Sequence, residues 1–400
     1  MSAPAGTGGG RPRARDLGIR IGRLQPGPLD AITDVPGVRV GHATIVRGDG
    51  PLVVGDGPVR TGVTVVLPHD GNVFLEPVFA GWHRLNGNGE LTGTAWLDEV
   101  GLLTGPIAIT NTHSVGVVHD AIIDLAVRSH PQGTGFWSLP VVGETWDGTL
   151  NDINGFHVHP EHVAEALVSA AAGPVLEGSV GGGTGMICHE FKGGIGTASR
   201  VLPADEGGWT VGVLVQANYG VRADLRIDGV PVGAEIPVTD VPSPHGDRAT
   251  PGVAGAGSII IIVATDAPLL PHQCRRLAQR AGLGLARVGG YGRNSSGDIF
   301  VAFATGNRGL PDMSDVDRGG DSTLTVRMLA DDRVNGLFHG AVDATEEAIV
   351  NALLAAGTVT GANGVTAHGL DAERVTRIMG AYGRATGPAG AGPMPEGDRR

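Results

Sequence analysis

Short runs of aliphatic and β-branched residues alternate with longer segments of helical periodicity through the middle of the chain. The most β-prone run covers residues 258–264, where four isoleucines and a valine follow a serine. An apolar run without alternation is typical of a strand buried on both faces. Similar runs predict further strands at residues 63–67, 106–110, 211–215 and 299–304.

Apolar residues at near-helical spacing predict helices between these strands. Ser114 is placed to act as the N-cap of a helix that continues to Val127. Pro160 suits the first position of a second helix, which ends before Gly173. Residues 268–280 are expected to form a third helix, with Gly282 as its stop.

Two more helices are predicted near the end of the chain, at residues 343–356 and 371–381. The first has Thr345 near its start and Glu346 and Glu347 in its first turn, where the helix dipole stabilises carboxylates. Because strands and helices alternate, we expect an α/β protein of layered sheets flanked by helices.

The composition excludes some classes of protein. Of the 400 residues, 41% are hydrophobic and 18% are charged, which is enough apolar material for a large core. The net charge of −12 argues against the broad basic surface of a nucleic-acid-binding protein. We see no secretory signal and no apolar run long enough for a membrane helix, and two distant cysteines suit a reducing compartment. We therefore expect a cytoplasmic protein.

The ends of the chain are rich in Gly, Pro and small residues. Residues 1–16 and 384–400 are therefore predicted to be disordered tails around one domain at 17–383. Lys192 is the only lysine among 29 Lys and Arg residues, and we interpret this as a compositional bias without a function.

The junction between Gly257 and Ser258 is the first candidate for chemistry. A loop rich in Pro, Gly and Ala, residues 240–257, runs directly into the strongest predicted strand. This is the layout of a self-cleaving N-terminal nucleophile, because a glycine lets the serine hydroxyl approach the preceding carbonyl. Cleavage would leave Ser258 with a free α-amine of pKa about 8, which can act as a local base. Taken alone, the pattern favours a serine that merely begins a strand.

Polar residues in short connecting segments give three more candidates, each with a plainer interpretation as an ordinary turn or loop. Residues 294–298 place Ser296 and Asp298 just before a strand, where they could relay a proton. Asn218 follows a strand and could donate to an oxyanion. Glu144, close to Trp146, could bind a cationic group.

Two further motifs could bind ligands. The glycine-rich residues 178–186 could cradle a phosphate, although no Walker lysine follows and close backbone packing explains the glycines as well. His157, His159 and His162 alternate near Glu161 as in some metal sites, but no further ligand lies at a known spacing. We expect no metal site there.

Taken together, these motifs resemble one family, the DmpA-type L-aminopeptidases/D-esterases, which include the β-peptidyl aminopeptidases. The resemblance covers about residues 17–383. The stretches that carry it are residues 29–38, 86–93, 110–116, 178–186, 191–194 and 257–258.

The resemblance implies a four-layer αββα sandwich, similar to that of N-terminal nucleophile hydrolases but differently connected. It also implies self-cleavage between Gly257 and Ser258 into an α chain, 1–257, and a β chain, 258–400. In proportion to length, the fragments would have masses of about 26 and 14 kDa out of 40.7 kDa. The fragments would stay associated, in a homotetramer of processed units.

The resemblance also assigns roles to single residues. Ser258 matches the nucleophile, Asn218 the oxyanion amide, and Ser296 with Asp298 the pair that supports the nucleophile. Glu144 matches the carboxylate that holds the ammonium group of the substrate. Trp146 stands where some members carry tyrosine, so no catalytic role is carried over to it.

The implied activity is that of a serine aminopeptidase without a metal or organic cofactor. Its substrates would be small peptides, amides or esters with a free amino group: L-amino acid amides, D-alanyl esters or β-peptides. Two alternatives stay open, a nucleotide-binding protein that uses residues 181–185 and a non-catalytic, ligand-binding relative.

Overall fold

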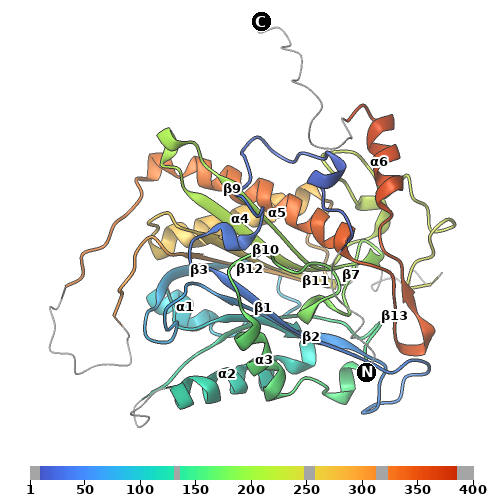
Figure 1. Cartoon of the computed structure of the whole chain (residues 1–400), viewed down its shortest axis with the longest axis horizontal. Coiled ribbons are helices and arrows are strands. Elements are labelled where there is room, and N and C mark those ends of the chain that lie inside the picture. Colours follow the sequence, from blue (N-terminus) through green and yellow to red (C-terminus); the bar gives the residue numbers. More distant parts are fainter. Residues whose placement is uncertain (1–9, 130–135, 247–256, 312–322, 385–400) are drawn as a thin grey trace, which may run out of the picture.

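The computed structural model describes residues 10–129, 136–246, 257–311 and 323–384 (Figure 1). The described part contains two large β-sheets and two pairs of helices. Most of the predicted loop at 240–257, namely residues 247–256, lies outside the described residues, as do residues 1–9 and 385–400 of the two predicted tails.

The larger sheet has six strands in the order β4-β3-β12-β11-β10-β9. Two central strands, β11 and β12, run parallel to each other, and both have antiparallel neighbours on their other sides. The bounds are β3 Val78–Arg84, β4 Leu102–Leu103, β9 Gly194–Val201, β10 Thr210–Asn218, β11 Gly257–Thr265 and β12 Ser296–Ala304.

The smaller sheet has four strands in the order β1-β2-β5-β6. Its bounds are β1 Arg39–Arg47, β2 Val59–Leu67, β5 Ile107–Asn111 and β6 Val141–Thr145. Two short hairpins complete the β-structure: β7 Ile187–Cys188 with β8 Phe191–Lys192, and β13 Val359–Thr360 with β14 Thr366–Ala367.

The helices cover the outer faces of the two sheets. Helices α4 Pro271–Arg287 and α5 Asn335–Ala355 pack on the six-stranded sheet, while α2 Val115–Ser129 and α3 Pro160–Ser169 pack on the four-stranded sheet (Figure 1). Helices α1 Thr94–Val100 and α6 Ala372–Ala381 lie at the periphery. The predicted αββα sandwich is therefore confirmed. None of the helices in the described ranges is long and apolar enough to cross a bilayer.

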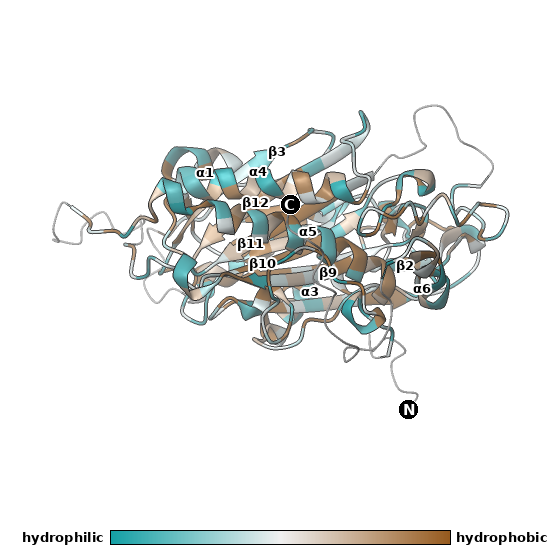
Figure 2. Ribbon diagram, turned by 90° about the horizontal axis from the view of Figure 1, so that it is seen from above, coloured by the Kyte–Doolittle hydropathy of each residue, from teal (hydrophilic) through white to brown (hydrophobic). Residues whose placement is uncertain are grey.

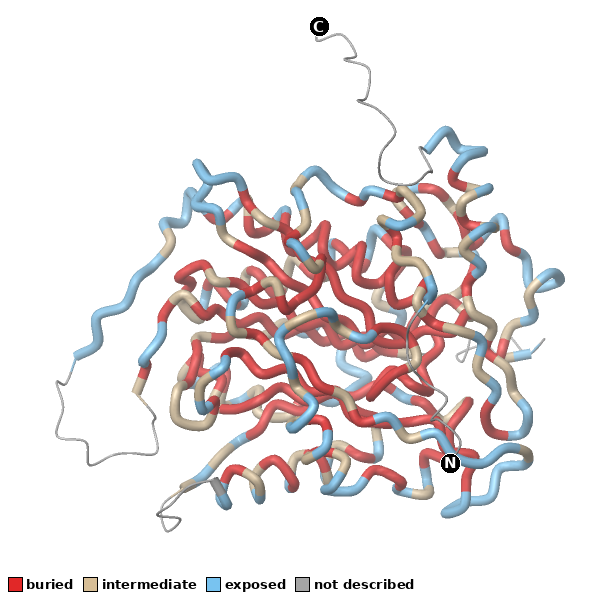
Figure 3. Tube along the Cα trace, in the orientation of Figure 1, coloured by how far each residue is buried: buried red, intermediate tan, exposed pale blue. Residues whose placement is uncertain are grey.

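Strand β11 shows why the continuous apolar run is needed. Ile259, Ile261 and Val263 face the core under α4 and α5, whereas Ile260 and Ile262 face the core between the two sheets. Burial is concentrated along the strands, and exposed segments lie at the rim (Figure 3). Seen from above, hydrophobic segments follow the strands beneath α4 and α5 (Figure 2). This packing buries both faces of the sheet, as the sequence pattern predicts.

Helix α2 begins at Val115, directly after Ser114, as predicted. The side-chain cap lies one short 3-10 turn earlier, where Asn111 accepts a hydrogen bond from the amide of His113. The end of α4 differs from the prediction. Helix α4 runs through Gly282 to Arg287. The glycines of α4 therefore serve close packing rather than ending the helix: a Cβ on Gly282 would be 3.2 Å from the ring of Phe300, and a Cβ on Gly284 would be 2.5 Å from the carbonyl oxygen of Val342 in α5.

Helix α5 begins at Asn335, so Glu346 and Glu347 lie in its middle and not in a first turn. Glu347 is fully buried and binds Arg200 on β9 at 2.5 Å and Arg15 at 2.8 Å. The prediction that the helix dipole stabilises Glu346 and Glu347 in a first turn is therefore wrong. These carboxylates are held by arginines that are distant in the sequence.

Part of the predicted N-terminal tail is ordered. The side chain of Arg13 pairs with Glu177 at 2.7 Å and donates to the carbonyl oxygen of Thr197, and Ala14 is fully buried. Residues 10–16 therefore form a packed strap, because three of them are arginines that find buried acceptors in the fold.

Candidate active site

The candidate site lies at the edge of the six-stranded sheet where β10 ends and the next two strands, β11 and β12, begin. Ser258 on β11 is opposite Asn218 on antiparallel β10 and opposite Gly297 on parallel β12. The sheet register thus brings together residues from three separate parts of the sequence.

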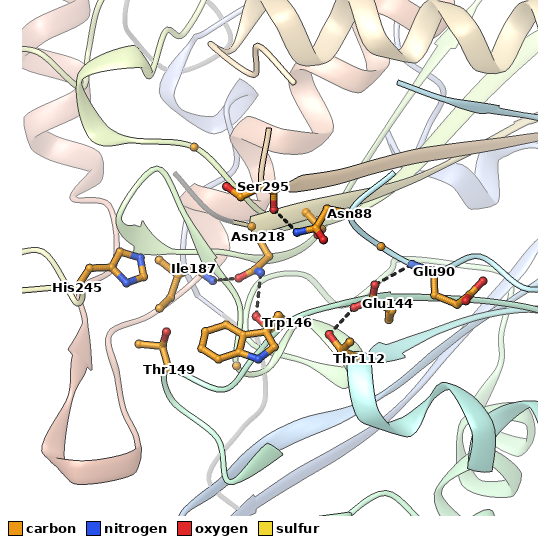
Figure 4. Close-up of a pocket in the computed structure, with 15 residues that line it drawn as sticks. Asn88, Glu90, Thr112, Glu144, Trp146, Thr149, Ile187, Asn218, His245 and Ser295 are labelled. Carbon is orange, nitrogen blue, oxygen red and sulfur yellow. Dashed lines mark hydrogen bonds between the residues drawn. The ribbon is translucent and has the colours of Figure 1, made fainter. Parts of the chain in front are cut away.

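A cavity of about 510 Å³ opens at this edge (Figure 4). It is shared by the two sheets, because Glu144 comes from the end of β6 in the four-stranded sheet. The described residues that line it are Asn88, Gly89, Glu90, Thr112, Glu144, Trp146, Thr149, Gly185, Ile187, Asn218, Gly220, His245, Gly257, Ser258 and Ser295.

Ser258 is nearly buried, with 5% of its surface exposed, and its Oγ accepts a hydrogen bond from the amide of Gly297 at 3.2 Å. The preceding position must be glycine, because a Cβ on Gly257 would collide with the carbonyl oxygen of Asn218. Close packing of the backbone therefore places the Gly257–Ser258 peptide bond against the cavity wall.

The side-chain amide of Asn218 has a fixed orientation. Its Oδ1 accepts a hydrogen bond from the amide of Ile187 at 2.8 Å, and its Nδ2 donates to the carbonyl oxygen of Trp146 at 2.9 Å (Figure 4). Since the backbone N–H can only donate and the carbonyl can only accept, the network defines which atom is oxygen. An amide nitrogen carries two hydrogens, so one remains for a ligand in the cavity.

Glu144 provides a buried carboxylate at the other side of the cavity. It accepts hydrogen bonds from the hydroxyl of Thr112 and, at 2.9 Å, from the amide of Glu90 (Figure 4). Burial raises the pKa of Glu144, and the bond from Thr112 partly opposes this effect. A buried carboxylate that lines the cavity and is held by two hydrogen bonds can bind a cationic group of a ligand.

Ser296 and Asp298 form a pair of their own. The hydroxyl of Ser296 donates to Asp298 at 2.6 Å, and burial raises the pKa of Asp298 to about 6 although this bond lowers it. Neither residue is among the described lining residues of the cavity, although both are on β12 beside Ser258. The structure therefore brings Ser258, Asn218 and Glu144 to one cavity and holds the Ser296–Asp298 pair behind it.

Several lining or supporting residues were not predicted individually. Thr112 and Glu90 hold Glu144, and the side chain of Asn86 accepts the amide of Asp298 at 2.8 Å. All three belong to the stretches 86–93 and 110–116 that carry the family resemblance. Those stretches gave the signal, but only the fold shows what each residue contacts.

The glycine-rich loop does not have the geometry of a phosphate site. The amides of Gly181 and Gly182 donate to the hydroxyls of Thr44 and Thr64, and the amide of Gly183 donates to Val180. The suggested nucleotide site at 181–185 is therefore wrong, because these N–H groups are used within the fold.

The histidine-rich stretch is engaged in ordinary contacts. His157 binds Asp152 at 2.9 Å and Arg47 at 3.1 Å, while His159 and His162 stack on each other. Within the described ranges, no cluster of three His, Cys, Asp or Glu side chains is arranged to hold a metal ion.

The fold and cavity define a class of hydrolase, as comparison with solved structures shows. A Burkholderia sp. β-aminopeptidase superposes with a TM-score of 0.86 at 56% identity, covering 93% of this chain and 99% of that chain. An L-aminopeptidase D-Ala-esterase/amidase from Ochrobactrum anthropi, described as a variant of the Ntn-hydrolase fold, gives 0.83 at 44% identity, with coverages of 94% and 99%. The protein is thus a hydrolase with a variant N-terminal-nucleophile fold.

Sequence comparisons identify the family. The sequence pattern of Peptidase family S58 matches residues 30–367. The β-peptidyl aminopeptidase BapA of Sphingosinicella microcystinivorans is 52% identical over 379 residues, 93% of each protein. The chain belongs to Peptidase family S58 and is a serine aminopeptidase, which confirms the resemblance seen in the sequence.

Proposed function

We propose that this aminopeptidase cuts its own chain between Gly257 and Ser258 and then removes the first residue of short peptides through an acyl-enzyme on Ser258. The observation that carries the proposal is the position of Ser258. It lies at the start of β11, opposite the amide-bearing Asn218, in a cavity that also contains the carboxylate of Glu144.

The proposed self-cleavage begins with an N→O acyl shift. Oγ of Ser258 attacks the carbonyl carbon of Gly257, the C–N bond breaks, and the hydroxyl proton passes to the departing nitrogen. Water then hydrolyses the ester, which frees the Gly257 carboxylate and restores the hydroxyl. The product is Ser258 with a free α-amine, whose ordinary pKa of about 8 suits a base at neutral pH.

The sheet order supports lasting association of the two fragments. Strands β11 and β12 belong to the segment 258–400, yet they lie between β10 and β3 of the segment 1–257. Separation would break ladders on both sides of this strand pair, besides the ion pairs between Arg200 and Glu347.

In turnover, the α-amine of Ser258 takes the hydroxyl proton while Oγ attacks the substrate carbonyl. The side chain of Asn218 donates to the oxyanion, and the amine that leaves takes the proton back. Water releases the acyl group by the reverse sequence. In this proposal the Ser296–Asp298 pair supports the nucleophile from behind.

Glu144 limits the enzyme to substrates with a free amino terminus, because only an ammonium group gains the ion pair at that end of the cavity. Among such substrates we favour peptides that begin with a β-amino acid. The relatives named β-peptidyl aminopeptidase and β-aminopeptidase share 52% and 56% identity with this chain, above the 44% of the L-aminopeptidase.

We also propose a homotetramer of processed units in the cytoplasm. The family resemblance supports the tetramer, and light scattering of the purified enzyme tests it. The two buried free cysteines, Cys188 and Cys274, suit a reducing compartment.

A panel of para-nitroanilides tests the activity. We expect hydrolysis of the β-homoamino acid and β-alanyl derivatives, slower hydrolysis of L-derivatives, and no hydrolysis after N-acetylation. Ser258→Ala should be inactive and uncut, whereas Ser295→Ala, at the neighbouring cavity wall, should be cut and active. Full activity of Ser258→Ala, or equal activity on N-acetylated substrates, would refute the proposal.

A further inference from the structure

Lys192 has an environment that its sequence context does not explain. It is the only lysine of the chain, it is fully buried, and its ammonium donates to the carbonyl oxygens of Gly183, Met186 and Gly193 at 3.1, 2.8 and 2.8 Å. An ammonium presents three hydrogens around one nitrogen, whereas the planar fork of arginine cannot point three donors at one converging set of carbonyls. This position therefore distinguishes lysine from arginine for a physical reason, and compositional bias does not account for it.

A single peptide unit joins this ammonium to the candidate oxyanion amide. The carbonyl of Met186 accepts from Lys192, and the amide of the next residue, Ile187, donates to Oδ1 of Asn218 at 2.8 Å. The one cis peptide in the described residues is Gly57–Pro58, so the Met186–Ile187 peptide is trans and its C=O and N–H point in opposite directions. Holding the carbonyl on one side therefore fixes the N–H on the other.

We propose that Lys192 is a positioning residue for the reaction: through the Met186–Ile187 peptide it holds the side-chain amide of Asn218 with Nδ2 toward the cavity. The inference rests on the proposed function, in which Asn218 stabilises the oxyanion. A positive charge on the carbonyl side also polarises the peptide, which strengthens the N–H bond to Asn218.

The surroundings of Lys192 act on its charge in both directions: burial disfavours the ammonium form, and the three carbonyl acceptors favour it. Burial lowers the pKa of Lys192 to about 7, while Cys188 and the carboxylate of Asp147 raise it. Asp147 follows Trp146, whose carbonyl oxygen accepts the other bond of Asn218. The two backbone groups that orient Asn218 thus lie next to two buried titratable side chains, Lys192 and Asp147.

The test is a double-mutant cycle on the processed enzyme with a β-alanyl anilide. Asn218→Ala alone should lower kcat by about 10²–10³-fold, the usual effect of removing one oxyanion donor. Lys192→Met keeps the length of the side chain without its donors and should lower kcat by about 10–100-fold, with KM changed less than about threefold because Glu144 is untouched. In the double variant, the Lys192 substitution should have no further effect, because its target is gone.

The possible outcomes separate this inference from the proposed function. An unchanged kcat in Asn218→Ala refutes the proposed role of Asn218. A reduced kcat in Asn218→Ala with full activity of Lys192→Met, or losses that multiply in the double variant, overturns the positioning role alone. Lys192→Gln, which keeps two donors, should retain more kcat than Lys192→Met. Insolubility of both Lys192 variants would assign the residue to the fold and would also overturn the inference.

Discussion

Two buried charged regions of this molecule differ in how their charges are satisfied. Beside the cavity, Lys192 is held by three backbone carbonyls. Under α5, Arg200 pairs with Glu347 at 2.5 Å, Arg15 pairs with the same carboxylate, and Arg13 pairs with Glu177. The first region orients backbone groups, whereas the second consists of ion pairs between side chains.

The difference indicates two separate uses of buried charge. The ion-pair network joins the N-terminal strap, β9 and α5, and it crosses between the two segments that the proposed cleavage would separate. Because the network lies away from Ser258 in the sheet, breaking it should lower the free energy of unfolding and leave kcat unchanged. The carbonyl of Met186, which Lys192 holds, belongs to the same peptide as the amide of Ile187, a residue that lines the cavity, so the effect of Lys192 should fall on kcat.

The largest expected effect comes from breaking the network. Glu347→Gln removes the carboxylate that Arg200 and Arg15 share and leaves the buried Arg200 with the more distant carboxylate of Asp30, at 3.5 Å. Breaking a buried ion pair in this way typically costs about 3–5 kcal/mol. Urea unfolding of the uncut Ser258→Ala chain measures this loss, and kcat of the processed enzyme should change less than about twofold. Glu373→Gln, on an exposed pair with Arg377, is the matched control and should cost under about 1 kcal/mol. Equal losses for both variants would contradict the comparison.

The next effect comes from the cavity. Asn218→Ala should lower kcat, because the loss of one oxyanion donor raises the activation free energy by about 3–4 kcal/mol. The unfolding free energy should change little. Asn88→Ala is the control, since Asn88 lines the same cavity but donates to the carbonyl oxygen of Ser295. A similar loss of kcat in both variants would remove Asn218 from its proposed role.

The Ser296–Asp298 pair gives a pH-dependent effect. Burial raises the folded-state pKa of Asp298 from 3.8 to about 6, so the folded protein binds its proton more tightly than the unfolded chain does. This stabilisation is complete below about pH 4 and is lost as the pH rises through about 6.

Asp298→Asn in the Ser258→Ala chain should therefore gain stability over its parent as the pH rises from about 4 to about 6. The gain should reach at most about 3 kcal/mol, from about two pKa units at 1.4 kcal/mol each. Urea titrations across this range measure it. A difference between the two proteins that is constant with pH would show that Asp298 is not perturbed in the folded state.

The smallest expected effect is on substrate binding. Glu144→Gln removes the charge that receives the ammonium group, a bond worth about 1.5–3 kcal/mol, so KM should rise about 10–100-fold. Glu90→Gln, whose exposed carboxylate lines the same cavity, should change KM less than about threefold. Equal increases would mean that general negative charge, rather than Glu144, selects the free amino terminus.

The sequence predicts those parts of the fold that depend on local pattern. The continuous apolar run of β11 requires burial on both faces, and its start at the Gly257–Ser258 junction was correctly located. The end of α4 was predicted wrongly, because Gly282, interpreted as a stop, lies inside the helix, where it packs against the ring of Phe300. The role of Glu347 was also missed, since its partners Arg15 and Arg200 are distant in the chain.

The candidate site could likewise be predicted only where the sequence carries a local signal. Ser258 and Asn218 could be selected because each lies at one end of a predicted strand, and Glu144 because it lies close to Trp146; all three also match the family resemblance. Lys192 carried no local signal beyond its rarity, because its importance depends on which carbonyls converge on it. The roles of Thr112 and Asn86 likewise depend on the fold, which brings Thr112 to Glu144 and Asn86 to Asp298.

The central claim is that Ser258 becomes a chain end, and the scarcity of lysine makes this directly measurable. The segment 258–400 contains no lysine, so an amine-reactive label can acylate it only at a newly formed α-amine. Intact-mass and peptide analysis of labelled native enzyme should find one label on a fragment of about 14 kDa that begins at Ser258. The Ser258→Ala chain should give no such fragment and no label within residues 258–400. An active enzyme that remains one unlabelled chain across residues 257 and 258 would contradict the account.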